Sequence, residues 1–309
     1  MNGNQPVGMI GLGIMGAAMS KNLLEAGFRV VGYDIAPLAL QAFAGRGGET
    51  ADSVAAVAAK ADILITSLPS TAALFDVVRE LKVVAQRERI VAETSTFGLD
   101  DKLKAQQELA EVGIVMLDCP LSGSGSQALE RDVLIYGSGP REAYDRCLSV
   151  FNGFSRAPHY LGRFGNGSKM KYVANLLVAI HTVAAAEAFA LARRAGLDPA
   201  QMFQVVSDGA GGSRALQVRG PMLIADSYLP IRTMPLDLWR KDLRIIGDFA
   251  NALSCPTPLF SASVPLFNAA VASGYGHQDT AAVCMVLEAL AGLPVHPPQR
   301  IPSSSTERS

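Results

Sequence analysis

Short apolar runs alternate with helix-like patterns along the first half of the chain. The apolar runs are bounded by glycine, proline or polar residues and cover residues 7–10, 28–33, 62–68, 89–93, 114–118 and 133–136. Segments with apolar residues at helical spacing follow most of them, at residues 17–27, from about 72, at 100–112 and at 141–151. Short buried runs that alternate with amphipathic helices are typical of βαβ units. The pattern therefore predicts an α/β fold with a Rossmann-type, doubly wound parallel sheet.

After Ala195 the pattern changes, and only helical spacing remains. Amphipathic segments are expected near residues 200–208, 213–224, 236–253, 257–273 and 279–291. We therefore predict a second, all-helical domain behind the sheet domain. The predicted division places a dinucleotide-binding domain at 1–165, a helical domain at 166–293 that begins with a long connecting helix over 166–195, and a tail at 294–309. The tail is rich in proline and serine and is expected to be disordered.

The segment that joins the two halves is almost uninterruptedly apolar. Residues 172–195 contain neither proline nor glycine, and a helix of this composition is expected to be buried nearly all round. Its length would also suit a membrane span. Polar side chains at Asn175, His181 and Glu187 would be costly in lipid, so a core helix of a soluble protein is favoured.

Lys171 and Asn175 stand at the start of this segment, four residues apart and hence on one helical face. Desolvation lowers the pKa of an amine, which is what a lysine needs in order to accept a proton near neutral pH. The same spacing also describes a surface lysine in front of a core helix. The choice between the two readings depends on the rest of the chain.

A glycine-rich turn follows the first apolar run and opens the first helix. In a strand–turn–helix unit this turn is the dinucleotide-binding fingerprint, in which backbone groups and the helix N-terminus bind a pyrophosphate. The residues of the turn are Gly11, Leu12, Gly13, Ile14, Met15 and Gly16. Asp34 ends the second strand, where a carboxylate would accept bonds from ribose hydroxyls and repel a 2′-phosphate. No arginine follows Asp34, so the sequence favours NAD over NADP.

Other strand ends offer further candidate contacts, because ligands bind at the carboxyl ends of strands in an open parallel sheet. Leu68, Pro69 and Thr96 are placed to meet the ribose or nicotinamide side of the cofactor, although each also fits an ordinary turn or helix cap. Residues 118–126 form a loop of small polar residues that would suit an anionic substrate such as a carboxylate. A solvent-exposed loop would be equally polar.

Composition narrows the classes of partner. The 309 residues include 27 basic and 28 acidic side chains without blocks of either sign, which argues against nucleic acid or an anionic membrane as the main partner. Four scattered cysteines without a CxxC motif make a zinc site or a disulfide scaffold improbable, so no metal site is predicted. They favour a reducing compartment, and the first seven residues lack the features of a signal peptide. A cytoplasmic location is expected.

Taken together, the motifs resemble those of the β-hydroxyacid dehydrogenase family, which includes 3-hydroxyisobutyrate dehydrogenase and tartronate semialdehyde reductase. The resemblance covers about residues 7–291. It is carried by the opening GLGIMGAAMSKNLLEAG, by Thr94-Ser95-Thr96, by Asp118 to Gly123, by Gly165-Asn166-Gly167 with Lys171 and Asn175, by Lys241-Asp242-Leu243, and by Gly274, Gly276 and Asp279.

This resemblance implies roles for single residues. Lys171 would be the catalytic lysine, and Asn175 would orient the substrate. Ser122 and Gly123, with the neighbouring Ser124, would hold the substrate carboxylate. The cofactor would be met by Thr96 and Lys241, in addition to the glycine turn.

Some positions depart from the family pattern. One asparagine of the usual pair is Ala174, and the second glycine of the substrate loop is Ser124. Where the family has G-x-x-G-T-L, this chain has Gln127, Arg131, Asp132 and Val133. An altered substrate loop beside intact catalytic and cofactor motifs indicates the same chemistry on a different acid. The turn at residues 209–214 could also help to select it, though a plain helix–helix turn is favoured over that role.

The resulting hypothesis is an NAD-dependent oxidoreductase that acts reversibly on the β-hydroxyl of a small hydroxy acid, with lysine as general acid and base. Two alternatives stay open: a semialdehyde-acid reductase that works mainly in the reducing direction, and a non-catalytic dinucleotide-binding module. An imine reductase is less expected, because such relatives generally replace the lysine. The surplus of apolar helix surface also predicts a homodimer or homotetramer.

Overall fold

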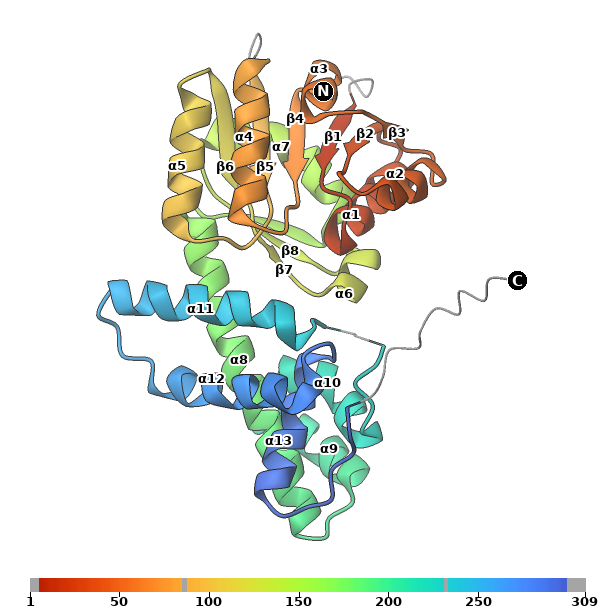
Figure 1. The fold of residues 1–309 in the computed structure, drawn as a ribbon, viewed down its shortest axis with the longest axis vertical. Helices are drawn as coiled ribbons and strands as arrows, with labels where there is room; N and C mark the ends of the chain where they lie inside the picture. Colours follow the sequence, from red (N-terminus) through yellow and green to blue (C-terminus); the bar gives the residue numbers. More distant parts are fainter. Residues whose placement is uncertain (1–5, 85–87, 231–232, 299–309) are drawn as a thin grey trace. The chain divides into compact units, whose positions relative to one another are not determined.

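The computed structural model describes residues 6–84, 88–230 and 233–298. It contains two compact units, Met1–Val173 and Ala174–Ser309, and the division between them falls within one long helix. Each unit has its own set of elements, which Figure 1 shows in sequence colours. The predicted tail lies mostly outside the described residues. Its described part, residues 294–298, forms neither helix nor strand.

The first unit is built on a parallel sheet in the order β3-β2-β1-β4-β5-β6. Its strands are β1 (Val7–Ile10), β2 (Val30–Tyr33), β3 (Glu49–Thr50), β4 (Ile63–Thr66), β5 (Arg89–Glu93) and β6 (Ile114–Asp118). This order, with its reversal between β1 and β4, is the doubly wound Rossmann arrangement. The predicted fold class is confirmed.

Alternating strand residues separate two hydrophobic layers, because successive side chains point to opposite faces of a sheet. Met9 and Leu117 belong to the layer under α1 (Ile14–Glu25) and α7 (Arg141–Phe154). Ile10 and Met116 belong to the opposite layer. That layer is covered by α3 (Val54–Lys60), α4 (Thr71–Val83) and α5 (Leu99–Ala110). A further helix, α2 (Pro37–Ala44), contributes Phe43 to the first layer.

A second, smaller sheet occupies part of the chain that the sequence pattern assigned to a loop and one strand. Its order is β7 (Leu121–Ser122), β8 (Leu134–Gly137) and β9 (Ala157–Tyr160), with β7 antiparallel to β8. The short helix α6 (Gly125–Leu129) lies between β7 and β8 in sequence. Residues 118–126 are therefore not an open loop, because part of this segment pairs as strand and part begins a helix.

Helix α8 (Asn166–Arg194) is the long connecting helix, and it corrects one expectation. The sequence pattern predicted burial nearly all round, but one stripe of this helix is exposed. The exposed apolar side chains on it are Met170, Val173, Leu177 and Leu191. In the described part of the chain this is the one helix long and apolar enough to cross a membrane, a test that core helices of soluble proteins also pass. Its opposite side, which includes Tyr172, Ala179 and Phe189, is fully buried.

The second unit is helical throughout its described elements. They are α9 (Pro199–Asp208), α10 (Arg214–Ala225), α11 (Leu236–Ala252), α12 (Pro258–Ala270), a π-helical turn at Val271–Tyr275, a 3-10 turn at Thr280–Ala282, and α13 (Val283–Leu290). Side-chain caps explain where α9 and α10 begin. Asp198 accepts a hydrogen bond from the backbone of Gln201, and Ser213 accepts one from the backbone of Leu216. The predicted helical segments coincide with these elements to within a few residues.

Candidate active site

The glycine turn after β1 has a backbone that larger residues could not adopt. Gly11 has a φ of +90°, and a Cβ atom on it would lie 2.1 Å from the carbonyl oxygen of Ser67. A Cβ atom on Gly16 would lie 1.9 Å from the carbonyl oxygen of Gly11. Both positions therefore need glycine, which lets α1 start close to the strands.

Gly13 differs from these two glycines because its Cβ position faces open space. No atom lies within 4 Å of that position in the described structure. Helix α1 begins at the next residue, and among the described side chains none caps its start. This is a cradle of backbone N–H groups at a helix N-terminus, and it fits the pyrophosphate of a dinucleotide.

The side chains of the turn divide between the core and the surface. Leu12 is 4% exposed and can offer a ligand only its backbone, whereas Met15 is half-buried and packs against the same hydrophobic layer. Ile14 is 71% exposed. It is the apolar side chain of the turn that a bound nucleotide could cover.

Asp34 lies beside the glycine turn, at the end of β2. Its Oδ2 accepts a hydrogen bond from the backbone nitrogen of Leu12 at 2.6 Å, and its Oδ1 accepts one from Ala36 at 2.8 Å. The carboxylate is half-buried and thus retains an accessible side. Its position fits a group that meets the adenosine ribose.

The loops after β4 and β5 meet at the same edge of the sheet as the glycine turn. The strand register pairs Ile10 with Thr66 and Thr66 with Glu93, so the three loops start side by side. The backbone nitrogen of Leu68 donates to Oγ of Ser95 at 2.8 Å, which joins two of the loops. Pro69 is exposed and Thr96 is half-buried. The structure thus brings together Leu68, Pro69, Thr96, the glycine turn and Asp34.

The predicted substrate loop is ordered by its own hydrogen bonds. Ser122 ends β7 and is half-buried, and Gly123 has a φ of +146° that disfavours any side chain. Ser124 caps α6 through a capping box with Gln127. Its Oγ atom also lies 2.9 Å from Oγ of Ser126, so two hydroxyls gather on an exposed turn.

The residues that depart from the family pattern farther along this loop serve the fold. Gln127 donates to Asp132 at 3.1 Å, and Asp132 pairs with Arg156 at 2.9 Å. Arg131 donates to the carbonyl oxygen of Asn152 at 2.8 Å. These side chains are held by protein partners, as is the side chain of Ser124 that caps α6. Ser122 and Gly123 are left as the positions of this loop that could contact a ligand.

Lys171 lies in the second turn of α8 and is 8% exposed. The helix can start close to the sheet because a Cβ atom on Gly167 would lie 2.2 Å from the carbonyl oxygen of Tyr136. The backbone nitrogen and Oγ of Ser168 donate to Asp118 at 2.7 and 2.8 Å. Lys171 is therefore a buried amine on a helix start that is fixed to the end of β6, not a surface lysine.

Asn175 comes one turn after Lys171 and is 5% exposed. Its Nδ2 atom donates to Oδ2 of Asp242 at 2.9 Å. Asp242 belongs to the Lys241-Asp242-Leu243 motif, in which the sequence analysis assigned a role to Lys241 alone. The Nζ atom of Lys241 lies 3.6 Å from Asp242, and its side chain is about one-third exposed.

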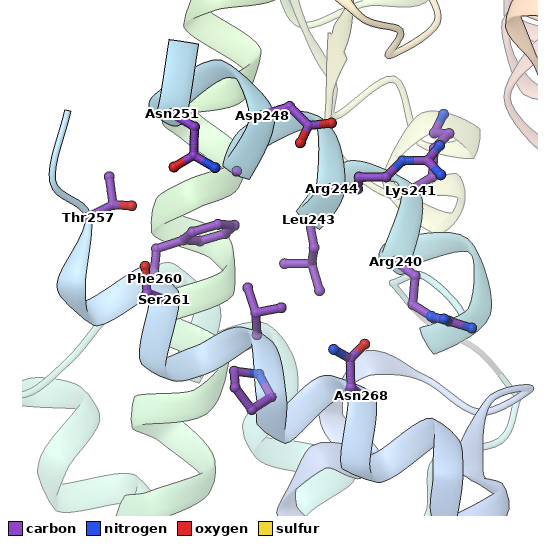
Figure 2. A pocket seen from close by; sticks show the side chains of 13 residues that line it. Arg240, Lys241, Leu243, Arg244, Asp248, Asn251, Thr257, Phe260, Ser261 and Asn268 are labelled. Atoms are coloured by element: carbon purple, nitrogen blue, oxygen red, sulfur yellow. The ribbon is translucent and has the colours of Figure 1, made fainter. Parts of the chain in front are cut away.

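A groove of about 640 Å³ runs between α11 and α12 (Figure 2). Arg240, Lys241 and Arg244 line it from α11, and Ser261 and Asn268 line it from α12. Asp248 lines the groove from the same helix, so this side carries three positive charges and one negative charge. In the described ranges no group of three or more histidine, cysteine or acidic residues could hold a metal ion.

In a comparison with known proteins, each half of the chain matches a family model. Residues 6–162 match the family model described as the NAD-binding domain of 6-phosphogluconate dehydrogenase. Residues 165–287 match the model described as NAD-binding of NADP-dependent 3-hydroxyisobutyrate dehydrogenase. The chain belongs to the β-hydroxyacid dehydrogenase family.

Relatives over the full length agree with this membership. An L-threonate dehydrogenase of Cupriavidus necator is 33% identical over 91% of this chain and 95% of its own length. A chloroplastic glyoxylate/succinic semialdehyde reductase of Arabidopsis thaliana is 27% identical over 93% of this chain and 80% of its own. The crystal structure of a 3-hydroxyisobutyrate dehydrogenase from Salmonella typhimurium is 30% identical, covers 92% of this chain and 100% of its own, and superposes with a TM-score of 0.82.

The resemblance stated from the motifs is thus confirmed. This β-hydroxyacid dehydrogenase is an oxidoreductase of hydroxy acids with a dinucleotide-binding domain. The comparisons leave two points to be proposed: which dinucleotide the protein prefers, and which side chains carry the chemistry.

Proposed function

We propose that the protein catalyses NAD-dependent, reversible oxidation of the β-hydroxyl of a small hydroxy acid, with Lys171 as general acid and base. The observation that carries this proposal is the burial of Lys171 on a helix start that is hydrogen-bonded to the end of β6. When bound, the nicotinamide supplies the hydride acceptor. Lys171 accepts the hydroxyl proton as the hydride leaves, and its ammonium form returns that proton in the reducing direction.

Asn175 positions the reacting groups in this proposal. One N–H of its amide donates to Asp242, which fixes the orientation of the amide, and its amide oxygen accepts a hydrogen bond from the substrate or from Lys171 in this proposal. The pyrophosphate is assigned to the cradle at Gly13, and the ribose to Asp34. Thr96 is also assigned to the cofactor, and the family motif implies the same role for Lys241.

The substrate carboxylate is assigned to the turn formed by Ser122, Gly123 and Ser124. Hydroxyl and backbone N–H groups are donors that suit a carboxylate. The hydroxyl of Ser126, whose Oγ lies 2.9 Å from Oγ of Ser124, would also bond to further hydroxyl groups on the acid. A polyhydroxylated four-carbon acid such as L-threonate, the substrate named for the relative in Cupriavidus necator, is therefore the first candidate.

The preference for NAD rests on Asp34. A 2′-phosphate on the ribose would place its negative charge beside this carboxylate, and Ile35, the next residue, carries no compensating charge. Ile35 is 86% exposed and offers only an apolar contact. NADP is therefore expected to bind less tightly.

A second candidate is the reduction of a semialdehyde acid by the same site. It is favoured by the similarity to the semialdehyde reductase of Arabidopsis thaliana. The chemistry is the reverse of the same step, so the two candidates differ in substrate and direction and share the catalytic groups.

The deciding experiment is a panel of hydroxy acids and semialdehyde acids assayed with each dinucleotide, following the absorbance of the reduced cofactor. We expect turnover with at least one β-hydroxy acid and NAD. Tight NAD binding without turnover on any acid would instead support the non-catalytic binding module.

Self-association is the remaining part of the proposal. The exposed apolar stripe on α8, formed by Met170, Val173, Leu177 and Leu191, is a surface that a second copy could cover. We propose a homodimer or homotetramer in the cytoplasm, with no nucleic-acid or membrane partner. Light scattering at micromolar concentration should give a molar mass of more than one chain, and Leu177→Glu should lower this molar mass.

A further inference from the structure

A buried ion cluster joins the strand ends of the first unit to the start of α8. The Nζ atom of Lys102, on α5, lies 2.6 Å from Oε2 of Glu93 and 2.9 Å from Oδ1 of Asp118. All three side chains are completely buried. Among the described residues, Lys102 is therefore the one cation that contacts both carboxylates.

Each carboxylate also holds a segment of the candidate site. Oε1 of Glu93 accepts a bond from the backbone nitrogen of Ser95 at 2.8 Å, and Oγ of Ser95 in turn accepts one from Leu68. Asp118 accepts both bonds from Ser168 in the first turn of α8. A continuous chain of polar contacts thus runs from the loops assigned to the cofactor to the helix that carries Lys171.

The charge of Lys102 is required for this chain of contacts. Burial by itself lowers the pKa of a lysine, but the charges of Asp118 and Glu93 outweigh that effect and raise the pKa of Lys102 above its ordinary range. Without the ammonium group, two buried carboxylates would repel each other and would separate or take up protons. The ends of β5 and β6 would then lose the side-chain link through Lys102 and keep only their backbone pairing.

A buried ion cluster is weak evidence for stability, since well-packed apolar residues often serve a fold equally well. The location of this cluster is more informative. It lies where β5 and β6 end, next to the loops of the candidate site, and the hydroxyl of Tyr172 makes a further bond to the carbonyl oxygen of Phe97. Two independent links therefore join the loop after β5 to the helix turn that contains Lys171.

We propose that Lys102 is a positioning residue that fixes Lys171 relative to the loops after β4 and β5. This inference rests on the proposed role of Lys171. Proton transfer requires the amine within hydrogen-bond reach of the substrate hydroxyl, and a shift of roughly 1 Å at such a group can cost about 100-fold in rate. Lys102 acts through the first turn of α8 and has no part in the chemistry.

The test compares Lys102→Met, the double variant Lys102→Met/Glu93→Gln, and the control Arg89→Met. Arg89 begins the same strand that Glu93 ends, is 4% exposed, and donates from Nε to Ala58. The control thus removes a buried cation from the far end of β5. The double variant removes one carboxylate together with the lysine, which restores the balance of buried charge.

Two measurements are made on each variant. The first is kcat and KM for the best hydroxy acid with saturating NAD. The second is amide hydrogen exchange of residues 165–172, which needs neither substrate nor cofactor. For Lys102→Met we expect kcat to fall about 10- to 100-fold with KM for NAD nearly unchanged, and exchange at the start of α8 to rise. Arg89→Met should leave both measurements at the parent values.

The double variant separates positioning from charge balance. We expect it to melt near the parent temperature while kcat remains low, because the side chains of Asp118 and Ser168 no longer have a link through Lys102 to β5. A return of kcat together with stability would show that Lys102 only balances charge, and would overturn the inference. Should Lys102→Met fail to fold, the double variant decides by the same two outcomes.

Lys171→Ala is measured in parallel so that the two proposals can fail separately. Normal turnover in Lys171→Ala would remove the proposed function. Slow turnover in Lys171→Ala beside an Lys102→Met variant that behaves like Arg89→Met would overturn the positioning role alone.

Discussion

Asn175 and Asp242 lie on different helices and are joined by a hydrogen bond of 2.9 Å from Nδ2 to Oδ2. Both side chains are almost fully buried, at 5% and 3% exposed. The bond fixes the orientation of the asparagine amide, and Lys241 adds a positive charge 3.6 Å from the same carboxylate. The aspartate of the Lys241-Asp242-Leu243 motif is thus bonded to the asparagine of the proposed catalytic pair.

Replacing Asp242 should therefore reduce stability in a manner that depends on the new side chain. Asp242→Leu leaves the buried Nδ2 of Asn175 without this acceptor, and the free energy of unfolding should fall by about 1–3 kcal/mol. Asp242→Asn keeps an oxygen acceptor and should lose much less. Urea denaturation measures both, with the exposed Asp248→Asn on the same helix as a control that changes stability by less than about 0.5 kcal/mol. Equal losses in both Asp242 variants would contradict this account.

Lys171→Ala should reduce turnover by about 10²–10⁴, the usual range for loss of a general acid and base. NAD binding, measured by fluorescence titration, should stay close to that of the parent protein, because the cradle at Gly13 is untouched. The matched control is Lys169→Ala, which removes an exposed lysine from the same helix. If the two variants had similar turnover, Lys171 would not be the proton-transfer group.

Asp34 should govern the choice between NAD and NADP. Two substitutions separate the effect of its negative charge from that of its hydrogen bond with Leu12. Asp34→Asn keeps an acceptor for the backbone nitrogen of Leu12 but removes the negative charge. The ratio of kcat/KM for NAD to kcat/KM for NADP should therefore fall toward one. Asp34→Ala should lower the same ratio and also weaken binding of both cofactors, because the glycine turn loses the hydrogen bond from the backbone of Leu12 to this carboxylate. Equal kcat/KM for the two cofactors in the parent protein would refute the assignment.

The main sheet could be predicted from sequence because its strands are buried on both faces. The strands Arg89–Glu93 and Ile114–Asp118 have the predicted bounds, since a continuous apolar run ends where a charged residue begins. The strands Glu49–Thr50 and Leu121–Ser122 have only two residues each, which is too short for any periodicity. For α8, apolar composition does not distinguish a buried face from an exposed one that a partner could cover.

The candidate site shows the same contrast between local and distant relationships. The glycine turn and Asp34 are local motifs, and the structure places them together. Lys102 stands in a segment rich in charged residues, where helical spacing suggests a solvated face, yet its partner Asp118 lies 16 residues away. Asp242 was named within the Lys241-Asp242-Leu243 motif, but its bond to Asn175 was not predicted, for the same reason. Which acid a buried lysine meets depends on tertiary packing, and single-sequence patterns carry no signal for it.

The ion cluster around Lys102 makes a prediction about alkaline stability. Lys102→Met should lower the free energy of unfolding at neutral pH by about 3–5 kcal/mol, as expected when one partner of a buried ion pair is removed. The pKa of Lys102 is raised in the folded protein, from an ordinary value of 10.5. The folded state therefore binds this proton more tightly, and the stabilisation is complete below 10.5 and disappears only as pH rises through the higher folded value.

Urea unfolding of parent and variant at several pH values measures this window. The difference in unfolding free energy should not decline between neutral pH and roughly pH 10 and should shrink above it. A difference that already declines between about pH 7 and 9 would show that another group is responsible.

The four cysteines should differ sharply in reactivity, because only the thiolate attacks electrophiles. Burial raises the pKa of Cys147 to about 12 and that of Cys119 well above its ordinary value, and burial aided by the charge of Glu288 also raises the pKa of Cys284. Cys255 is exposed. An aromatic disulfide reagent at neutral pH should therefore release one equivalent quickly and the other three only after unfolding. Cys255→Ser should abolish the fast phase, whereas a fast phase that survives in this variant would mean that a buried thiol becomes accessible by local opening of the fold.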